Sequence, residues 1–131
     1  MALGKIKADT LEHSTAGSLD TQYVVNGSAK AWSSLDSSGG STTTQHGSFN
    51  VSSVLDDGTG QYGFNFTNNM NGATYSSVGS CNDNSSYNCV TNWTGVPSAY
   101  TSGRTGMGVL NIPTSTYADS DVCVVVNGDL A

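Results

Sequence analysis

The side chains that could carry out catalysis are few and lie far apart in the sequence. Zinc sites need clustered Cys and His ligands, but His13 and His46 are distant from the three cysteines, and no CxxC spacing occurs. The chain also contains no GxSxG, HExxH or Walker motif, and no GxGxxG after a predicted strand. The sequence therefore predicts no catalytic residues, no metal site and no cofactor.

Two acidic pairs, Asp56-Asp57 and Asp119-x-Asp121, leave two further interpretations open. Paired carboxylates can coordinate calcium, or they can act as the acid and the nucleophile of a glycosidase. However, DDGTG has the composition of a turn, and the second pair directly precedes an apolar strand. A surface-polysaccharide-degrading enzyme is therefore the less favoured interpretation, and we expect no enzyme.

Aromatic and amide side chains gather in the segment SYNCVTNWTGVPSAYTSGR, residues 86–104. Aromatic faces stack on pyranose rings and amides bind sugar hydroxyls, so this segment predicts a glycan-binding surface. Its candidate residues are Tyr87, Asn92, Trp93, Tyr100 and Arg104. The alternative is that Trp93 and Tyr100 simply cover one end of the fold.

The three cysteines are Cys81, Cys89 and Cys123. The segment CNDNSSYNC forms a short polar loop that a Cys81–Cys89 disulfide could close. The alternative is three reduced thiols in a protein made in a cytoplasm.

Length and charge restrict the class of protein. With 131 residues, the chain is long enough for one domain. Its net charge of −6, with only four cationic side chains, disfavours nucleic acid and anionic membranes as partners. No apolar run reaches the length of a membrane-spanning helix, and the first residues, MALGKIKADT, lack the apolar region of a secretion signal.

Short β-strands separated by strong turn signals predict the architecture. In SFNVSSVLDDGTGQYGFNFT, residues 48–67, Phe49 and Val51 alternate with polar residues, as do the aromatic residues at 62, 64 and 66, which predicts a hairpin with one buried face. YVVNGSAKAW predicts a second hairpin, around Asn26-Gly27. Residues 35–45 predict a polar loop, and VCVVVN predicts a central strand buried on both faces.

Together these patterns predict seven or eight strands and no helix of useful length. The expected fold is an all-β antiparallel sandwich with a jelly-roll-like body over residues 23–131. Residues 1–22 have too few apolar side chains for a core, so we expect an extended N-terminal arm that pairs with its own domain or with neighbouring subunits.

The runs IKADTLEHSTAG, SAKAW and SFNVSSVLDDGTGQYGFNFTNNMNGATYSSVGS resemble a repeated pattern in fibre and appendage proteins of tailed bacteriophages, especially those of marine cyanobacteria. The resemblance covers about residues 6–80 and implies a homotrimeric, β-rich virion surface protein assembled in the host cytoplasm. It leads us to expect a tail fibre or tail-tip component that contributes to recognition of host-surface glycans. The alternative is a capsid decoration protein or head fibre, in which residues 1–22 bind other virion proteins.

Overall fold

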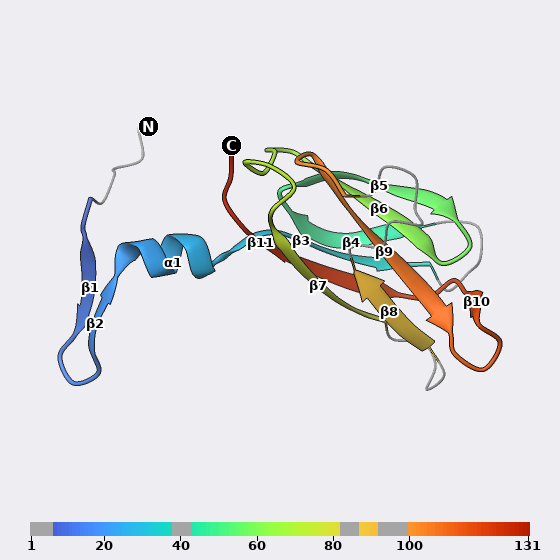
Figure 1. Ribbon diagram of the computed structural model, residues 1–131, viewed down its shortest axis with the longest axis horizontal. Coiled ribbons are helices and arrows are strands. Elements are labelled where there is room, and N and C mark those ends of the chain that lie inside the picture. The colour runs from blue at the N-terminus through green and yellow to red at the C-terminus, as the bar shows by residue number, and fades with distance from the viewer. Residues whose placement is uncertain (1–6, 38–42, 82–86, 92–99) are drawn as a thin grey trace.

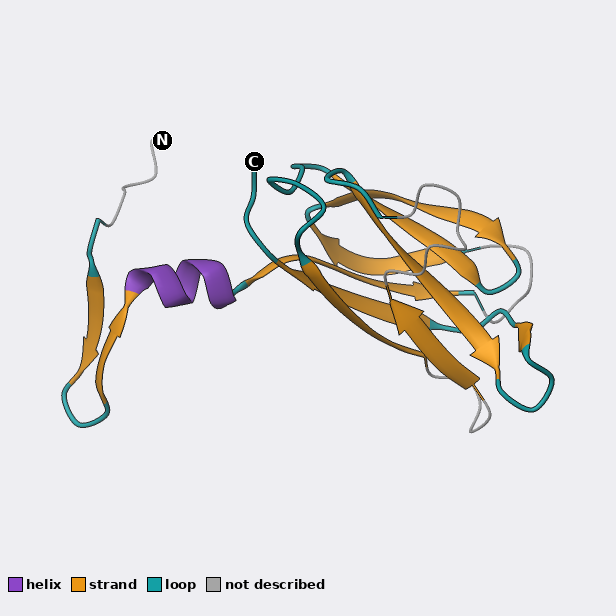
Figure 2. Ribbon diagram, viewed as in Figure 1, coloured by secondary structure: helices purple, strands orange, loops and turns teal. Residues whose placement is uncertain are grey.

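The protein folds into two antiparallel β-sheets packed face to face, preceded by a projecting hairpin and helix (Figure 1, Figure 2). The computed structural model describes residues 7–37, 43–81, 87–91 and 100–131, with only the backbone described for 87–91. Sheet I contains, in order, β4 (Thr44–Phe49), β3 (Ala29–Asp36), β11 (Val122–Asn127) and β7 (Ser76–Cys81). Sheet II contains β10 (Thr116–Tyr117), β9 (Arg104–Asn111), β6 (Gln61–Phe66) and β5 (Val51–Gly58), and β8 (Tyr87–Thr91) also pairs with β9. The predicted all-β sandwich is confirmed.

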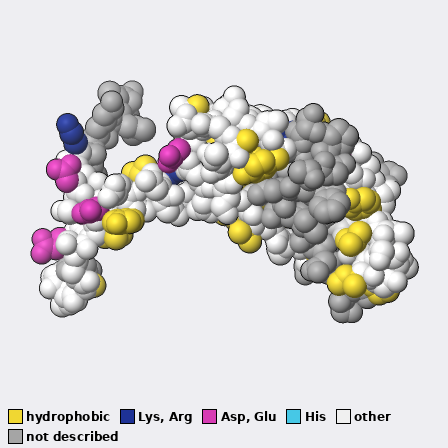
Figure 3. Space-filling view, viewed as in Figure 1, with side chains coloured by type: hydrophobic (Ala, Val, Ile, Leu, Met, Phe, Trp, Pro, Cys, Tyr) yellow, Lys and Arg dark blue, Asp and Glu magenta, His cyan; other side chains and the backbone are white. Residues whose placement is uncertain are grey.

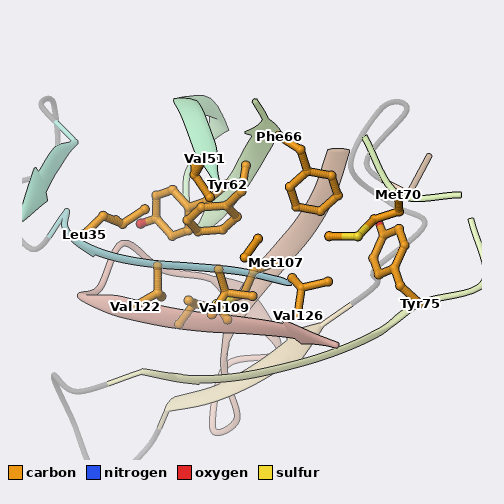
Figure 4. Packing of buried hydrophobic residues seen from close by; sticks show 13 residues of the cluster. Leu35, Val51, Tyr62, Phe66, Met70, Tyr75, Met107, Val109, Val122 and Val126 are labelled. Atoms are coloured by element: carbon orange, nitrogen blue, oxygen red, sulfur yellow. The ribbon is translucent and has the colours of Figure 1, made fainter. Parts of the chain in front are cut away.

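The core lies between the two sheets (Figure 4). Alternate residues of β6 point into it, as the period of two predicts: Tyr62 and Phe64 are fully buried and Phe66 nearly so. From the opposite sheet, β11 contributes three valines to the same cluster. The buried hydrophobic residues are Ala31, Leu35, Val51, Tyr62, Phe64, Phe66, Met70, Tyr75, Met107, Val109, Val122, Val124 and Val126.

The β5–β6 hairpin is confirmed, but its first strand begins later than predicted. Asn50 adopts a left-handed backbone conformation, with φ of 54°, between β4 of sheet I and β5 of sheet II. The chain therefore changes sheets at this residue, and the expected alternation is interrupted. Consequently Phe49 ends β4 with its side chain exposed, whereas Val51 enters the core.

Two expectations about sheet I are corrected. Strand β11 is central, as predicted, but only one of its faces is buried, because Cys123 and Val125 point outward. The predicted polar loop from Leu35 is wrong at its start, since β3 continues to Asp36 and Leu35 is in the core. Pairing with both β4 and β11 keeps the serine-rich end of β3 in the sheet.

The N-terminal segment, residues 7–27, is not a simple extended arm. Strands β1 (Thr10–His13) and β2 (Gly17–Asp20) form a hairpin, and helix α1 (Thr21–Gly27) follows at once. The predicted hairpin at Asn26-Gly27 is wrong, because Asn-Gly ends the helix here, with the Ser28 amide donating to the Val24 carbonyl. Among the described residues, the pairing of β3 with β11 begins only at Ala29, so the backbone of residues 21–27 forms its hydrogen bonds within the helix instead.

The described part of the chain contains no helix of the length and apolar character needed to cross a membrane.

Candidate functional site

A small polar hollow lies where the end of α1, the turn after β6 and the C-terminal tail meet. Its volume is about 230 Å³. The lining residues are Asn26, Met70, Asn71, Gly72, Thr74, Tyr75, Gly128 and Asp129. Three segments far apart in the sequence thus contribute to one site.

Backbone pairing between the turn and the tail fixes the shape of this hollow. The Asn71 amide donates to the Asp129 carbonyl at 2.8 Å, and the Ala131 amide donates to Asn69 at 2.9 Å. Gly72 has a φ of 139°, a conformation that only glycine adopts without strain. A side chain at Gly128 would approach the Tyr75 Cβ to 2.6 Å, so the tail can pack closely only because this residue is a glycine.

Tyr75 forms the wall of the hollow that faces the core. Its hydroxyl donates to the Arg104 carbonyl, and its ring meets Phe66 edge-on at a centroid distance of 5.6 Å. Tyr100 lies against its other side at 4.6 Å and donates its hydroxyl to the Tyr75 carbonyl. Burial removes water from the Tyr75 hydroxyl and raises its pKa to about 12.

The polar groups of the hollow suit a ligand rich in hydroxyl groups. Asn26 and Asn71 carry amides that both donate and accept hydrogen bonds, Thr74 adds a hydroxyl and Asp129 a carboxylate. Met70 and Tyr75 also line the hollow but are only 2% and 5% exposed, so its accessible surface is mainly polar. Amide, hydroxyl and carboxylate groups together can form hydrogen bonds with the hydroxyl groups of a sugar.

The structure describes the predicted glycan-binding residues to different extents. Asn92 and Trp93 lie outside the described residues, and for Tyr87 only the backbone is described, opposite Asn111 at the start of β8. Tyr100 supports the wall of the hollow through Tyr75, which agrees with its alternative role of covering one end of the fold. The binding roles of these residues remain predictions.

Arg104 is engaged in the fold itself. From the start of β9, its guanidinium reaches across β6 and forms an ion pair with Asp57 on β5, and both side chains are largely buried. The arginine lies directly over Gly63, where any Cβ would collide with it. Its shape and charge are thus used to hold the outer side of sheet II.

The acidic pairs accept hydrogen bonds from groups of the fold itself. Asp56 accepts from the Gly58 amide in the hairpin turn, and Asp121 accepts from the Ser37 amide. Asp119 accepts from the Gly60 amide at 2.7 Å and from the Tyr62 hydroxyl at 3.4 Å. Across the described ranges, no group of three or more His, Cys, Asp or Glu side chains is arranged to hold a metal ion.

Among the described cysteines, Cys81 carries a free thiol and packs against the core, and the Cys81–Cys89 disulfide remains a prediction. Cys123 is also free, and it is exposed. The side chain of Cys89 lies outside the described atoms.

The residues that line the hollow are not among those that the sequence predicts to bind glycans. Asn26-Gly27 predicts a hairpin turn, and both Asn71 and Asp129 lie outside the segment of residues 86–104. The sequence offers one indication of these residues: Asn26, Asn71 and Asp129 each lie beside a glycine in a short polar segment. Nothing in their spacing shows that they meet.

Comparison of the chain with protein-family models, with curated proteins and with solved structures finds no match.

Proposed function

We propose that this protein is a structural component of a tailed-phage virion, a homotrimeric tail fibre or tail-tip protein that helps to bind glycans on the host surface. The sequence resemblance over residues 6–80 supports the virion role. The observation that carries the binding role is the polar hollow formed by Asn71, Thr74 and Asp129 around the buried Tyr75.

Binding at each hollow is weak in this mechanism. Its volume of about 230 Å³ is below the roughly 300–1,000 Å³ typical of small-molecule pockets, so it accommodates about one sugar unit. Three such sites on one trimer bind a repeating polysaccharide together, and the effective concentration of the second and third sites raises the overall affinity.

A capsid decoration protein or head fibre is the second candidate function. It is favoured by the N-terminal segment, which projects from the sandwich and has no buried side chain among its described residues (Figure 1). A projecting segment of this kind can bind the shell while the sandwich faces outward. In that case residues 1–22 are the contact with other virion proteins.

Antibody labelling of intact particles in electron microscopy separates these candidates. Label at the end of the tail supports the host-recognition role, and label spread over the head supports the decoration role. Absence of label from every particle would contradict both.

Glycan binding itself is tested with the purified protein on a glycan array, followed by titration of any bound glycan. Asp129→Asn and Asn71→Ala each remove hydrogen-bonding groups from the hollow, so we expect affinity to fall by about three- to tenfold. Asp36→Asn is the control, because this exposed carboxylate lies at the opposite end of β3. An equal loss in the control, or no binding by the wild type, would argue against the proposed site.

A further inference from the structure

Four exposed apolar side chains cross the outer face of sheet I in one line. Phe49, Trp32, Val125 and Val78 lie directly opposite one another on β4, β3, β11 and β7. Their exposed fractions are 54%, 41%, 42% and 65%. We call these four residues the outer row.

The neighbouring positions on this face make the outer row stand out. Two residues along each strand in one direction, the facing positions are Gly47, Ser34, Cys123 and Ser80, all small and uncharged. In the other direction β3 carries Lys30, whose ammonium is bound to the Val25 carbonyl. Gly47 is packed beneath the Trp32 ring, since a Cβ there would be 3.3 Å from it. The outer row therefore rises above its surroundings as an apolar ridge, with no charge among its four residues or at the four small positions beside it.

The N-terminal segment offers a second uncovered apolar surface. No described side chain of residues 7–27 is buried, and Figure 3 shows hydrophobic side chains on the surface of this projecting part. Leu11 and Leu19 lie opposite each other on β1 and β2. A largely apolar hollow of about 320 Å³ lies between the hairpin and α1. It is lined by Lys7, Ala8, Leu11, Thr21, Val24 and Val25.

This segment needs a partner to be stable. A helix of seven residues and a two-stranded hairpin are both marginal in water when nothing packs on them. The protein's own sandwich does not cover them, because two contacts hold α1 in its projecting direction. The side-chain amide of Asn127 donates to the Gly27 carbonyl at 3.1 Å, and the Lys30 ammonium donates to the Val25 carbonyl.

We propose that the N-terminal segment of one copy of this chain docks on the outer row of a second copy. A ridge is matched with a hollow: the hollow has about ten times the roughly 30 Å³ volume of one water molecule, enough for an aromatic side chain such as Trp32. Because the two surfaces belong to different parts of the chain, the contact is head-to-tail and can close into a ring. This docking rests on the proposed function, because a homotrimer requires self-association.

The sizes of the two surfaces support a second copy as the occupant. With about 150–250 Å² per aromatic side chain and the lower end of that range for Val and Leu, the exposed fractions give on the order of 400 Å² for the outer row and a similar area for Leu11, Leu19, Tyr23, Val24 and Val25. Of these five residues, Leu11, Val24 and Val25 line the hollow itself. A standard interface needs about 800 Å² per partner, of which a little over half is apolar. Each surface therefore has about the apolar area that a stable interface requires.

Sedimentation of full-length variants tests the interface. Val125→Lys places a charge in the outer row and Val24→Lys places one in the hollow, so we expect each to convert the oligomer to monomer, with at least a tenfold weaker association. Leu55→Lys is the matched control: its side chain is exposed to a similar extent, at 39%, but lies on β5 of the other sheet. It should leave the oligomer intact.

Mixing the two defective variants tests the head-to-tail geometry. Val125→Lys retains an intact N-terminal segment and Val24→Lys retains an intact outer row, so the mixture should form a dimer that neither forms alone. A sheet-to-sheet interface would give no such rescue, and this result would overturn the docking of the segment.

Other outcomes contradict the inference directly. A monomeric wild type at high micromolar concentration, or an oligomer that survives Val125→Lys, would show that the outer row is not the interface. Particle labelling is independent of these results: an oligomer with the expected variant behaviour but no label on virions would contradict the proposed function and leave the interface standing.

Discussion

At the scale of single residues, Tyr75 connects the core to the candidate site. Its ring packs between Phe66 and Tyr100, and its hydroxyl is bound by the Arg104 carbonyl. Only 5% of its surface is exposed, although it lines the hollow. A change at this residue therefore affects both the stability of the fold and the shape of the site.

The raised pKa of Tyr75 predicts how stability depends on pH. Its folded-state pKa, about 12, is above the ordinary value of 10.0, so its contribution to stability is complete below pH 10 and is lost as pH rises toward 12. Tyr75→Phe should cost about 1 kcal/mol at pH 7 through the lost hydrogen bond, and its stability should decline less steeply above pH 10. Urea unfolding from pH 7 to 11.5 measures both effects, and parallel profiles for the two proteins would contradict the prediction.

At the scale of elements, Asn50 decides how the two sheets are connected. Its left-handed conformation turns the chain from β4 into β5. Its side-chain amide donates to the Lys30 and Asn68 carbonyls, and its side-chain oxygen accepts from the Asn68 amide at 2.7 Å. The corner is thereby joined to β3 and to the segment after β6.

Two substitutions at Asn50 separate backbone strain from hydrogen bonding. Asn50→Gly removes the side-chain hydrogen bonds but tolerates the left-handed conformation. Asn50→Ala removes the same hydrogen bonds and also strains the backbone at the positive φ. We expect Ala to be less stable than Gly by about 1–2 kcal/mol, and both to be less stable than the wild type. Chemical denaturation measures the difference, and equal stability of the two variants would show that the corner is not strained.

At the scale of the whole molecule, the core lies in the sandwich, and we propose that the N-terminal segment carries the association. All thirteen residues of the core cluster lie in or between the strands that follow α1. The segment before them contributes no buried side chain among its described residues. We therefore expect folding and assembly to depend on different parts of the chain.

Deletion of residues 1–27 tests this division. We expect the shortened chain to keep its β-sheet circular dichroism and to unfold cooperatively, because its core is intact, but to sediment as a monomer. The loss of the Asn127 and Lys30 contacts to α1 should cost about 1–2 kcal/mol at most. An unfolded product would show that the segment stabilises the sandwich, and a truncated protein that still forms oligomers would argue against its role in assembly.

Local patterns in the sequence were sufficient for the fold class and for much of the core. Alternation in β6 correctly identified a strand with one buried face, and the DDGTG turn correctly identified a hairpin. The apolar run of β11 correctly identified a central strand but wrongly predicted burial of both its faces. These predictions succeeded because burial on one face imposes a period of two on the residues themselves. The short strand patterns and frequent turn signals also correctly excluded a predominantly helical fold.

Features that depend on distant partners were decided by the tertiary structure. Whether Asn26-Gly27 ends a helix or turns a hairpin depends on whether a neighbouring strand is present, and whether Val125 is buried depends on what covers sheet I. The hollow joins Asn26, Asn71 and Asp129 through pairing of the chain's tail with a turn nearly sixty residues earlier. The sequence alone determined for which residues burial is energetically favourable. Only the packing of remote segments decided which of these residues remained exposed and where the polar groups met.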